Sequence, residues 1–359
     1  MKVVHVHRMR GIGGSERHLL ALLPALTHFG LEPIFIGLDD PAWEPQPFYE
    51  VLDEARVPSV RLRSRRDVDP ALVLSLARTL RRLRPDLVHT HLVHADLYGA
   101  LAARGRLFST KHNDDRFRTG AFRFVERALT RRAERVIAIS HSLARFVTEE
   151  VGLPVEKVEV VHYGLDGPPA PWGENPPCRV PGNAAVLLVV SRLAEQKGVD
   201  RAIRALPAIR ASHPDAVLVV LGDGPARPRL AALALELGVD DAVFLLGRVP
   251  DVAYWLRRAV MLVHTPRWEG FGLALLEAML ASLPVVATKV SSIPELVLDC
   301  ETGLITPPDA IPQAVARLLS DAPLRERLGQ AGLERARNDF SVDRMARRTA
   351  ALYGALESS

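Results

Sequence analysis

The amino-acid sequence predicts an α/β protein of two domains, each built on a doubly wound parallel sheet. Two observations support this fold class. Short apolar runs alternate with longer segments of helical periodicity along the 359 residues, which is the pattern of parallel βαβ units. The stretch 166–183 is crowded with proline and glycine, and the alternation restarts after it. We therefore expect an N-terminal domain over 1–165, a linker over 166–183 and a C-terminal domain over 184–337, facing each other across a central cleft that holds the site.

Apolar runs of the first half predict strands, and periodic segments between them predict helices. The predicted strands are Val3–His7, Pro33–Gly37, Asp86–Thr90, Leu107–Lys111, Val136–Ser140 and Val158–His162. The predicted helices are Ser15–Phe29, Pro70–Leu83, Phe122–Ala133 and Ala144–Val151.

The second half repeats the pattern. The predicted strands are Ala185–Val190, Ala216–Leu221, Val243–Leu246, Met261–His264, Val285–Thr288 and Gly303–Ile305. The predicted helices are Gly198–Ser212, Pro225–Leu237, Val252–Arg258, Leu273–Ala281, Ile293–Val297 and Pro312–Leu319. Ser341 is a good N-cap for a last helix, and we expect the segment 338–359 to cross back to the N-terminal domain.

Composition narrows the class of protein. A chain that is 48% hydrophobic and 25% charged is typical of globular proteins, and no apolar run approaches the ~20 residues of a membrane-spanning helix. The apolar start is too short for a secretory signal, so we expect a cytoplasmic protein. Cys178 and Cys300 stand far apart, which argues against a disulfide framework or a zinc site.

Glycines follow the first predicted strand in the sequence Gly11-Ile12-Gly13-Gly14-Ser15-Glu16. They let the backbone approach a ligand closely, and the helix that they open presents free N–H groups to an anion. The pattern is not G-x-G-x-x-G, and a tight turn without a ligand is an equally good interpretation of it alone.

The segment from Ser191 to Gly198 is more specific. Arg192 and Lys197 are five residues apart at the mouth of a predicted strand, so both can converge on one diphosphate. In the segment Arg267–Ala278, Glu269 precedes a glycine loop and Glu277 lies inside the next helix. The two carboxylates can accept from the hydroxyls of two different sugars, while the N–H groups of residues 270–273 face phosphate.

These motifs carry a resemblance to a known family. The pattern S-R-x-x-x-x-K-G followed by E-G-F-G-x-x-x-x-E-A resembles the retaining glycosyltransferases of family four, group 1, which use nucleotide sugars and have the GT-B fold of two Rossmann-like domains. The likeness extends along most of the chain, through Gly13–Glu16, Asp86–His91, Arg135–Ser140, Leu221–Pro225, Phe244–Arg248 and Pro284–Thr288.

The resemblance implies roles for individual residues. In the C-terminal domain, Arg192 and Lys197 would bind the donor's pyrophosphate, Glu269 the transferred sugar and Glu277 the ribose hydroxyls. Arg248 would border the base, and Gly270, Phe271, Gly272 and Leu273 would face phosphate. In the N-terminal domain, the loop of Gly13 and Gly14 would face the diphosphate, and His112 would lie beside the donor sugar.

Three departures from the family's pattern put the sugar's identity in doubt. The usual Asn-Gly at the end of the first domain is replaced by His162-Tyr163-Gly164. The usual paired glycine before Pro-Glu is replaced within Val290–Glu295, and the strand before Glu269 continues as Thr265-Pro266-Arg267-Trp268, where Pro-Ser is commoner.

The resulting prediction is a hexosyltransferase of polysaccharide biosynthesis that retains the donor's anomeric configuration and needs neither a cofactor nor a metal ion. The donor would be a nucleotide-diphosphate sugar, with a UDP-sugar favoured over a GDP-sugar, and the acceptor a hydroxyl of a glycan or lipid-linked molecule. A nucleotide-sugar 2-epimerase of the same fold and a non-catalytic nucleotide-sugar-binding protein stay as alternatives. Nucleic acid is not expected as a partner, because aromatic residues form only 6% of the chain and offer no stacking platform.

Two further patterns leave alternatives open. His89 and His91 alternate on one strand, a possible metal-ligand spacing, but we favour packing at a strand end or lining of the acceptor side. The segment Arg116–Arg132 is amphipathic and basic, and could contact an anionic membrane reversibly on its inner face. The favoured alternative is that its apolar face, with Phe124, Val125 and Ala128, packs on the sheet.

Overall fold

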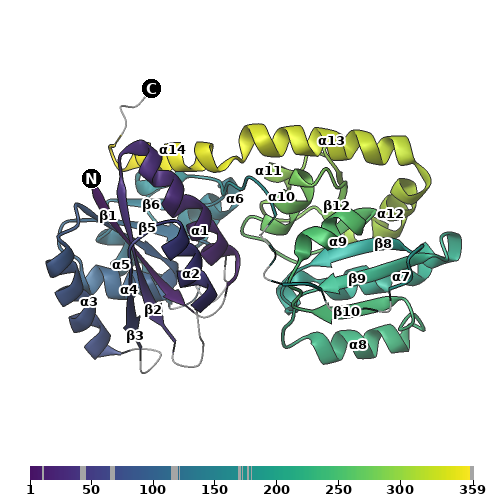
Figure 1. The fold of residues 1–359 in the computed structure, drawn as a ribbon, viewed down its shortest axis with the longest axis horizontal. Helices are drawn as coiled ribbons and strands as arrows, with labels where there is room; N and C mark the ends of the chain where they lie inside the picture. Colours follow the sequence, from purple (N-terminus) through teal and green to yellow (C-terminus); the bar gives the residue numbers. More distant parts are fainter. Residues whose placement is uncertain are drawn as a thin grey trace. The chain divides into compact units, whose positions relative to one another are not determined.

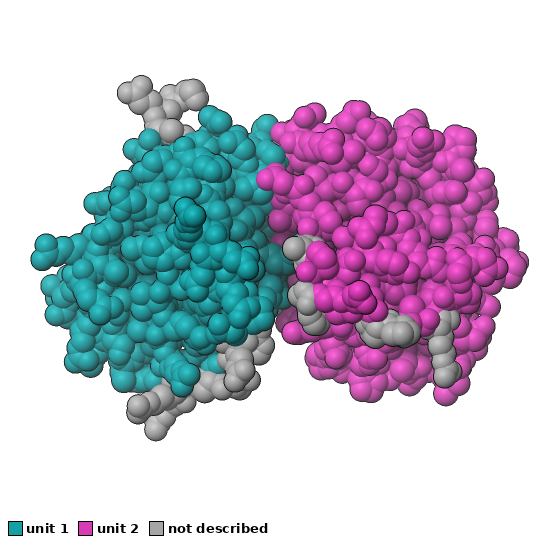
Figure 2. All heavy atoms as spheres, in the orientation of Figure 1, with its two compact units in different colours: residues 1–164, 341–359 teal, residues 165–340 magenta. Residues whose placement is uncertain are grey.

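The computed structural model describes residues 1–9, 12–40, 46–64, 69–114, 120, 122–168, 171, 173–175, 178 and 180–355. The chain divides into two compact units, each held together by its own internal contacts (Figure 2). Unit 1 comprises Met1–Gly164 and Ser341–Ser359, and unit 2 comprises Leu165–Phe340. Gly11, residues 115–119 and six residues of the segment 166–183 lie outside the described residues. Within the described ranges, no helix is both long enough and apolar enough to span a membrane.

The sheet of unit 1 is parallel throughout its described strands, in the order β3-β2-β1-β4-β5-β6-β7 (Figure 1). The strand order reverses beside β1 and β4, the position at which sheets of this kind bind ligands. The strands are β1 (Lys2–Met9), β2 (Glu32–Asp39), β3 (Ser59–Arg63), β4 (Leu87–His91), β5 (Arg106–Lys111), β6 (Arg135–Ala138) and β7 (Val158–Val160).

Helices lie between consecutive strands of this sheet, as parallel pairing requires. They are α1 (Gly14–Leu26), α2 (Gln46–Glu54), α3 (Pro70–Leu83), α4 (Leu92–Ala102), α5 (Phe122–Arg131) and α6 (His141–Arg145), which continues as a π-helical turn over Phe146–Glu150. The C-terminal helix α14 (Val342–Leu352) returns to the same unit.

The C-terminal helix α14 packs beside α1 in unit 1. Met345, Ala346, Ala350 and Tyr353 are buried in one apolar cluster with residues of β1 and α1. Ser341 caps the helix by accepting from the N–H of Arg344, as the sequence predicts. The helix begins at Val342 rather than at residue 338.

Unit 2 repeats the architecture with a parallel sheet in the order β10-β9-β8-β11-β12-β13. Its strands are β8 (Ala185–Val190), β9 (Ala216–Leu221), β10 (Val243–Gly247), β11 (Met261–His264), β12 (Val285–Thr288) and β13 (Leu304–Thr306). Its helices are α7 (Val199–Ser212), α8 (Arg227–Glu236), α9 (Val252–Arg258), α10 (Leu273–Leu280), α11 (Ile293–Leu296), α12 (Ile311–Ser320) and α13 (Ala322–Asp339).

The predicted fold class is confirmed, and the errors concern single elements. The sequence patterns missed α2, β3, α4 and α13. The predicted helix Ala144–Val151 begins three residues earlier, at His141, because Ser140 accepts from the N–H of Leu143 and so caps the helix there. The last strand of unit 1 ends at Val160 instead of His162.

Candidate functional site

In unit 2 the segment 191–198 forms a loop between β8 and α7. It rests on the neighbouring loop after β9, because the N–H of Leu193 donates to Asp223 O at 3.0 Å and the N–H of Ala226 donates to Leu193 O at 2.9 Å. A Cβ atom at Gly222 would lie 2.0 Å from Ser191 O, so only glycine allows this approach. The Arg192 side chain is exposed on this loop.

Glu269, on the loop after β11, is the partner of Lys197. The Lys197 ammonium donates to Glu269 Oε2 at 2.6 Å, and His264 Nε2 lies 3.1 Å from the same oxygen. Burial alone would raise the pKa of Glu269, but the charge of Lys197 and the hydrogen bond with His264 outweigh burial and lower that pKa to about 2. Glu269 is therefore a carboxylate at any physiological pH.

A second ion pair ties the two loops together. Arg267 donates from both terminal nitrogens to the Asp200 carboxylate, at 2.8 Å each, and its backbone N–H donates to Gln196 O at 2.7 Å. Thr265 Oγ1 donates to Gly198 O at 2.9 Å. The sequence analysis gave no role to Asp200, Arg267 or Thr265, yet these residues hold the loops of Lys197 and Glu269 together.

The glycine loop 270–272 leads into α10, whose N-cap is Gly272. Ser292 holds this loop from α11, because its hydroxyl donates to Glu269 O at 3.0 Å and lies 3.2 Å from Phe271 O. Ser292 stands where the family usually has a paired glycine, so this departure adds a hydroxyl that supports the loop. Glu277 is almost completely buried inside α10, and Leu273 begins that helix.

Arg248 is exposed directly after β10. Its position at the carboxyl end of an edge strand of the sheet is consistent with a residue that borders a ligand of unit 2.

In unit 1, Gly13 is the N-cap of α1 and Gly14 its first residue, and both are exposed. The Glu16 carboxylate accepts from the N–H of Gly13 at 2.9 Å and from Ser15 Oγ at 2.9 Å. The Glu16 carboxylate therefore already occupies one of the backbone N–H donors with which the N-terminus of α1 could bind an anion.

His112 follows β5 and is nearly buried. Its Nε2 lies 3.0 Å from His91 Nδ1, and its Nδ1 is hydrogen-bonded to the Tyr163 hydroxyl. Burial, and then the charges of neighbouring histidines and of Lys111, hold the pKa of His112 well below its usual range. Tyr163 stands where the family usually has asparagine, so this departure places a phenol against His112.

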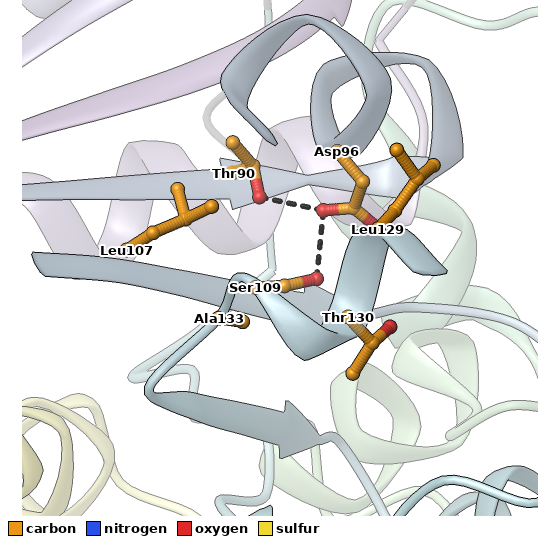
Figure 3. Close-up of a pocket in the computed structure, with 7 residues that line it drawn as sticks. All are labelled: Thr90, Asp96, Leu107, Ser109, Leu129, Thr130 and Ala133. Carbon is orange, nitrogen blue, oxygen red and sulfur yellow. Dashed lines mark hydrogen bonds between the residues drawn. The ribbon is translucent and has the colours of Figure 1, made fainter. Parts of the chain in front are cut away.

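A buried ion cluster anchors helix α5. The Lys111 ammonium lies 2.6 Å from Asp96 and 3.2 Å from Glu126. Ser109 Oγ donates to Asp96 at 2.7 Å, a bond drawn in Figure 3. A cavity of about 10 Å³ beside Asp96 just reaches the space that one water molecule needs.

Helix α5 thus turns a polar face toward the sheet, and the favoured packing of its apolar face is wrong. Glu126 and Thr130 are buried, whereas Phe124 is 59% exposed and Val125 is 45% exposed. The ion pair of Glu126 with Lys111 outweighs the amphipathic pattern, because a lysine buried on β5 requires a carboxylate partner.

Comparisons with known proteins identify the class. The family model described as glycosyl transferases group 1 matches residues 176–335, and the model for glycosyltransferase family 4 matches residues 12–166. The glycogen synthase of Mycobacterium tuberculosis is 30% identical over 292 residues, which are 77% of this chain and 70% of that protein. The lipopolysaccharide core biosynthesis mannosyltransferase LpcC of Rhizobium leguminosarum is 33% identical over 173 residues, 46% of this chain and 49% of that protein.

Among solved structures, Anabaena HepE in complex with UDP and glucose superposes with a TM-score of 0.84 at 22% identity, covering 99% of this chain and 100% of that chain. Two parallel α/β sheets of this kind define the GT-B fold. The chain belongs to family 4, group 1 of the glycosyltransferases, and is a nucleotide-sugar-dependent glycosyltransferase.

Proposed function

We propose that this enzyme transfers a hexosyl group from a nucleotide-diphosphate hexose to a hydroxyl of a glycan or lipid-linked acceptor, with retention of anomeric configuration and without a metal ion. The observation that carries the proposal is the pairing of Lys197 with Glu269. It joins a cation suited to a diphosphate to a permanent carboxylate suited to sugar hydroxyls, on two loops that share hydrogen bonds.

Cleavage of the bond between the anomeric carbon and the diphosphate develops negative charge on the leaving phosphate. The ammonium of Lys197 has three N–H donors and uses one for Glu269, which leaves donors for phosphate oxygens. The exposed guanidinium of Arg192 and the N–H groups at the start of α10, around Gly270, Phe271, Gly272 and Leu273, add to the same positive field. We assign these groups to the leaving diphosphate, because charge stabilisation of this kind lowers the barrier most.

Glu269 binds the sugar in this proposal. In the described part of unit 2, Lys197 and His264 both bond Oε2, so Oε1 is the oxygen that accepts from a sugar hydroxyl. We assign the ribose hydroxyls to Glu277, the border of the base to Arg248, and the first-domain contacts with diphosphate and sugar to the Gly13–Gly14 loop and His112.

A UDP-hexose is the favoured donor, since HepE holds UDP and glucose in its crystal structure. A thermal-shift panel of UDP-, GDP-, ADP- and dTDP-sugars tests this choice. At about 100 Kd the correct nucleotide sugar stabilises the folded protein by about 2.7 kcal/mol. Release of the nucleotide only when an acceptor is present then separates transfer from epimerisation, and equal shifts for all four bases contradict a UDP preference.

We further propose that the acceptor lies on an anionic membrane, where the enzyme works as a peripheral protein on the inner face. Helix α5 supports this proposal, because Phe124 and Val125 are exposed beside the exposed Arg123 and Arg131. LpcC, to which part of the chain is similar, acts in lipopolysaccharide core biosynthesis.

Co-sedimentation with phosphatidylglycerol and phosphatidylcholine vesicles at low and high salt tests this surface. We expect binding to the anionic vesicles at low salt, and loss of binding in a Phe124→Ser/Arg131→Ala double variant. Leu235→Ser, which removes an even more exposed apolar side chain from α8 of unit 2 (68%, against 59% for Phe124), is the control and should bind like the parent. If the double variant binds the vesicles as well as this control, α5 is not the surface that contacts the membrane, and the proposal fails.

A further inference from the structure

Six buried histidines of unit 1 gather around the carboxyl ends of β1, β4 and β5. The strand register places His5 opposite His89 and His7 opposite His91 on the adjoining strands β1 and β4. The members of this group are His5, His7, His18, His89, His91 and His112, and each is at most 9% exposed.

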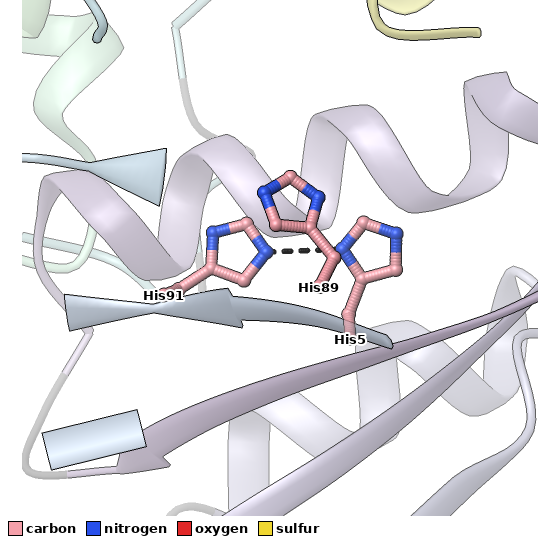
Figure 4. Close-up of side chains that lie close together, drawn as sticks. All are labelled: His5, His89 and His91. Atoms are coloured by element: carbon pink, nitrogen blue, oxygen red, sulfur yellow. Dashed lines mark hydrogen bonds between the residues drawn. The ribbon is translucent and has the colours of Figure 1, made fainter. Parts of the chain in front are cut away.

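Three of these rings form a chain of hydrogen bonds that ends at His112. His5 Nδ1 lies 3.0 Å from His91 Nε2, a bond drawn in Figure 4. His91 Nδ1 lies 3.0 Å from His112 Nε2, and His112 Nδ1 is hydrogen-bonded to Tyr163. Both nitrogens of His91 and both nitrogens of His112 are therefore used by protein partners.

The direction of each hydrogen bond between these rings, donor to acceptor, follows from His5, the ring at the buried end. His5 Nε2 has no hydrogen-bond partner in the part of the chain that the structure describes. A buried N–H without an acceptor is rarer in proteins than a buried acceptor without a donor. His5 therefore carries its proton on Nδ1 and donates to His91.

The remaining protons are then fixed. Because His91 Nε2 accepts from His5, His91 carries its proton on Nδ1 and donates to His112 Nε2. His112 in turn carries its proton on Nδ1 and donates to the Tyr163 oxygen. Burial lowers the pKa of each of the three histidines well below the usual range, so all three rings are neutral at pH 7.

A metal ion is a weaker explanation of the same cluster. Nitrogens of His5, His89 and His91 lie within 4.8 Å of one another, which is compatible with a three-histidine site. However, His89 Nε2 lies 2.7 Å from Thr110 Oγ1 and its Nδ1 is bonded to the Tyr353 hydroxyl, so neither nitrogen of His89 is available without breaking a bond. The distance of 3.0 Å between His5 Nδ1 and His91 Nε2 is that of a hydrogen bond, so a proton and not a metal ion lies between these nitrogens.

We propose that His91, oriented by His5, is a positioning residue for the transfer reaction that holds the His112 ring in the Nδ1–H form between His91 and Tyr163. This inference rests on the proposed place of His112 beside the donor sugar. Held in this way, the ring is neutral and offers no N–H to the substrate. His112 then acts through the position of its ring and of the backbone at the end of β5, and not as a proton donor.

Histidine-selective ¹⁵N NMR of the full chain tests the tautomers directly. We expect Nδ1–H signals for His5, His91 and His112, assigned by single substitutions. His112 in the Nε2–H form, or as a cation at pH 7, overturns the proposal. Loss of the three signals on addition of one equivalent of Zn²⁺, with metal retained through dialysis, also overturns it in favour of a metal site.

Kinetics of two variants at His91 test the positioning role. His91→Asn keeps a donor near the place of Nδ1, so we expect His112 to stay in its tautomer and kcat to stay within about threefold of the parent. His91→Leu removes the donor, so we expect a mixture of His112 tautomers and a fall of kcat on the order of tenfold with little change in the donor KM. Equal kcat in the Leu and Asn variants overturns the role of His91.

Two more variants keep the outcomes apart. Where His91→Leu does not fold, Tyr163→Phe removes only the phenol oxygen and leaves the donor of His91 in place, so His112 should keep its Nδ1–H form. An Nε2–H form of His112 in this variant contradicts the proposal. His112→Ala tests the proposed function itself. If this variant keeps full kcat while the parent protein shows the three Nδ1–H signals, the assignment of His112 to the donor site fails and the hydrogen-bonded chain stands.

Discussion

The ammonium of Lys197 lies 2.6 Å from Glu269 Oε2, although the two residues are 72 positions apart and lie on loops that follow different strands. Lys197 belongs to the loop after β8, and Glu269 to the loop after β11, and β8 and β11 are neighbours in the sheet. A buried carboxylate that binds sugar hydroxyls needs a neutralising cation, and here that cation is one that we also assign to the donor's diphosphate. In the proposed function, this one contact couples the donor phosphate to the donor sugar.

Lys197→Ala should lower kcat/KM by about one to two decades. The loss of one charge-assisted contact with the leaving diphosphate corresponds to roughly 1.5–3 kcal/mol. The variant also leaves Glu269 buried without the cation that offsets burial, so the pKa of Glu269 should rise and a new acidic limb should appear in the pH profile of kcat/KM. Steady-state kinetics between pH 5 and 8 measure both effects. Lys197→Arg, which keeps the charge, is the control, and near-parental kcat/KM in the Ala variant refutes the assignment.

Arg267→Lys should weaken donor binding severalfold without direct contact to the donor. The guanidinium holds both oxygens of Asp200, and an ammonium cannot form that two-pronged bond. Isothermal titration with the nucleotide sugar, in a double-mutant cycle with Asp200→Asn, measures the coupling. Because both side chains are about a quarter exposed, we expect a coupling free energy of about 1 kcal/mol or less. Strictly additive effects would show that the pair does not support the loops.

The sequence predicts which residues belong to this site, but it does not predict that Lys197 and Glu269 form an ion pair. Arg192, Lys197, Glu269 and Glu277 stand within a few residues of strand ends or helix starts, where apolar periodicity is easily recognised. The contact between Lys197 and Glu269 depends on strand order, which periodicity does not encode. The same holds for the histidine chain, because the register of β1 and β4 aligns residues 84 positions apart, such as His5 and His89.

The missed elements also have physical causes. Helix α13 contains Gly329 and Gly332, which lower helix propensity, but a Cβ atom at Gly329 would lie 2.1 Å from Ser282 O. Tertiary packing therefore requires a residue that local propensity disfavours. The edge strand β3 carries Arg61 and Arg63 and pairs only with β2, so it has no continuous apolar run to mark it.

The buried histidines should make unit 1 sensitive to mild acid. Burial, and then the charges of nearby histidines, lower the pKa of His18 and of His89 to about 3, whereas a histidine in the unfolded chain has a pKa of about 6.5. Below pH 6.5 the unfolded chain binds protons that the folded chain cannot bind. The stability is therefore full above pH 6.5 and falls as the pH decreases, by about 2 kcal/mol at pH 5 for each of the two histidines.

Urea titrations at pH 7.5 and 5.0, followed by pulsed hydrogen exchange of β1 and β4 amides, measure this loss in unit 1. His89→Gln should reduce the pH dependence by about one histidine's share, whereas His28→Gln, on an exposed 3₁₀ turn, should leave it unchanged. Glu269 does not interfere, because its lowered pKa affects stability only below about pH 4.5. A urea midpoint that is equal at the two pH values contradicts neutral, buried histidines.

Gly222→Ala should abolish donor binding while the chain still folds. Gly222 has a φ of +122°, and its Cβ atom would meet Ser191 O at 2.0 Å, so the loop that carries Arg192 must move away from its support. Gly238→Ala is the matched control. Its φ is +63°, but nothing lies within 4 Å of the added Cβ, so it should cost only the ~1–2 kcal/mol of a left-handed alanine and leave donor affinity intact. Both variants place alanine at a positive φ, and only Gly222→Ala displaces the 191–198 loop. Thermal unfolding of both variants measures the cost of the strain, and calorimetric titration measures the donor affinity. If both variants lose the same affinity, strain and not the position of this loop controls donor binding.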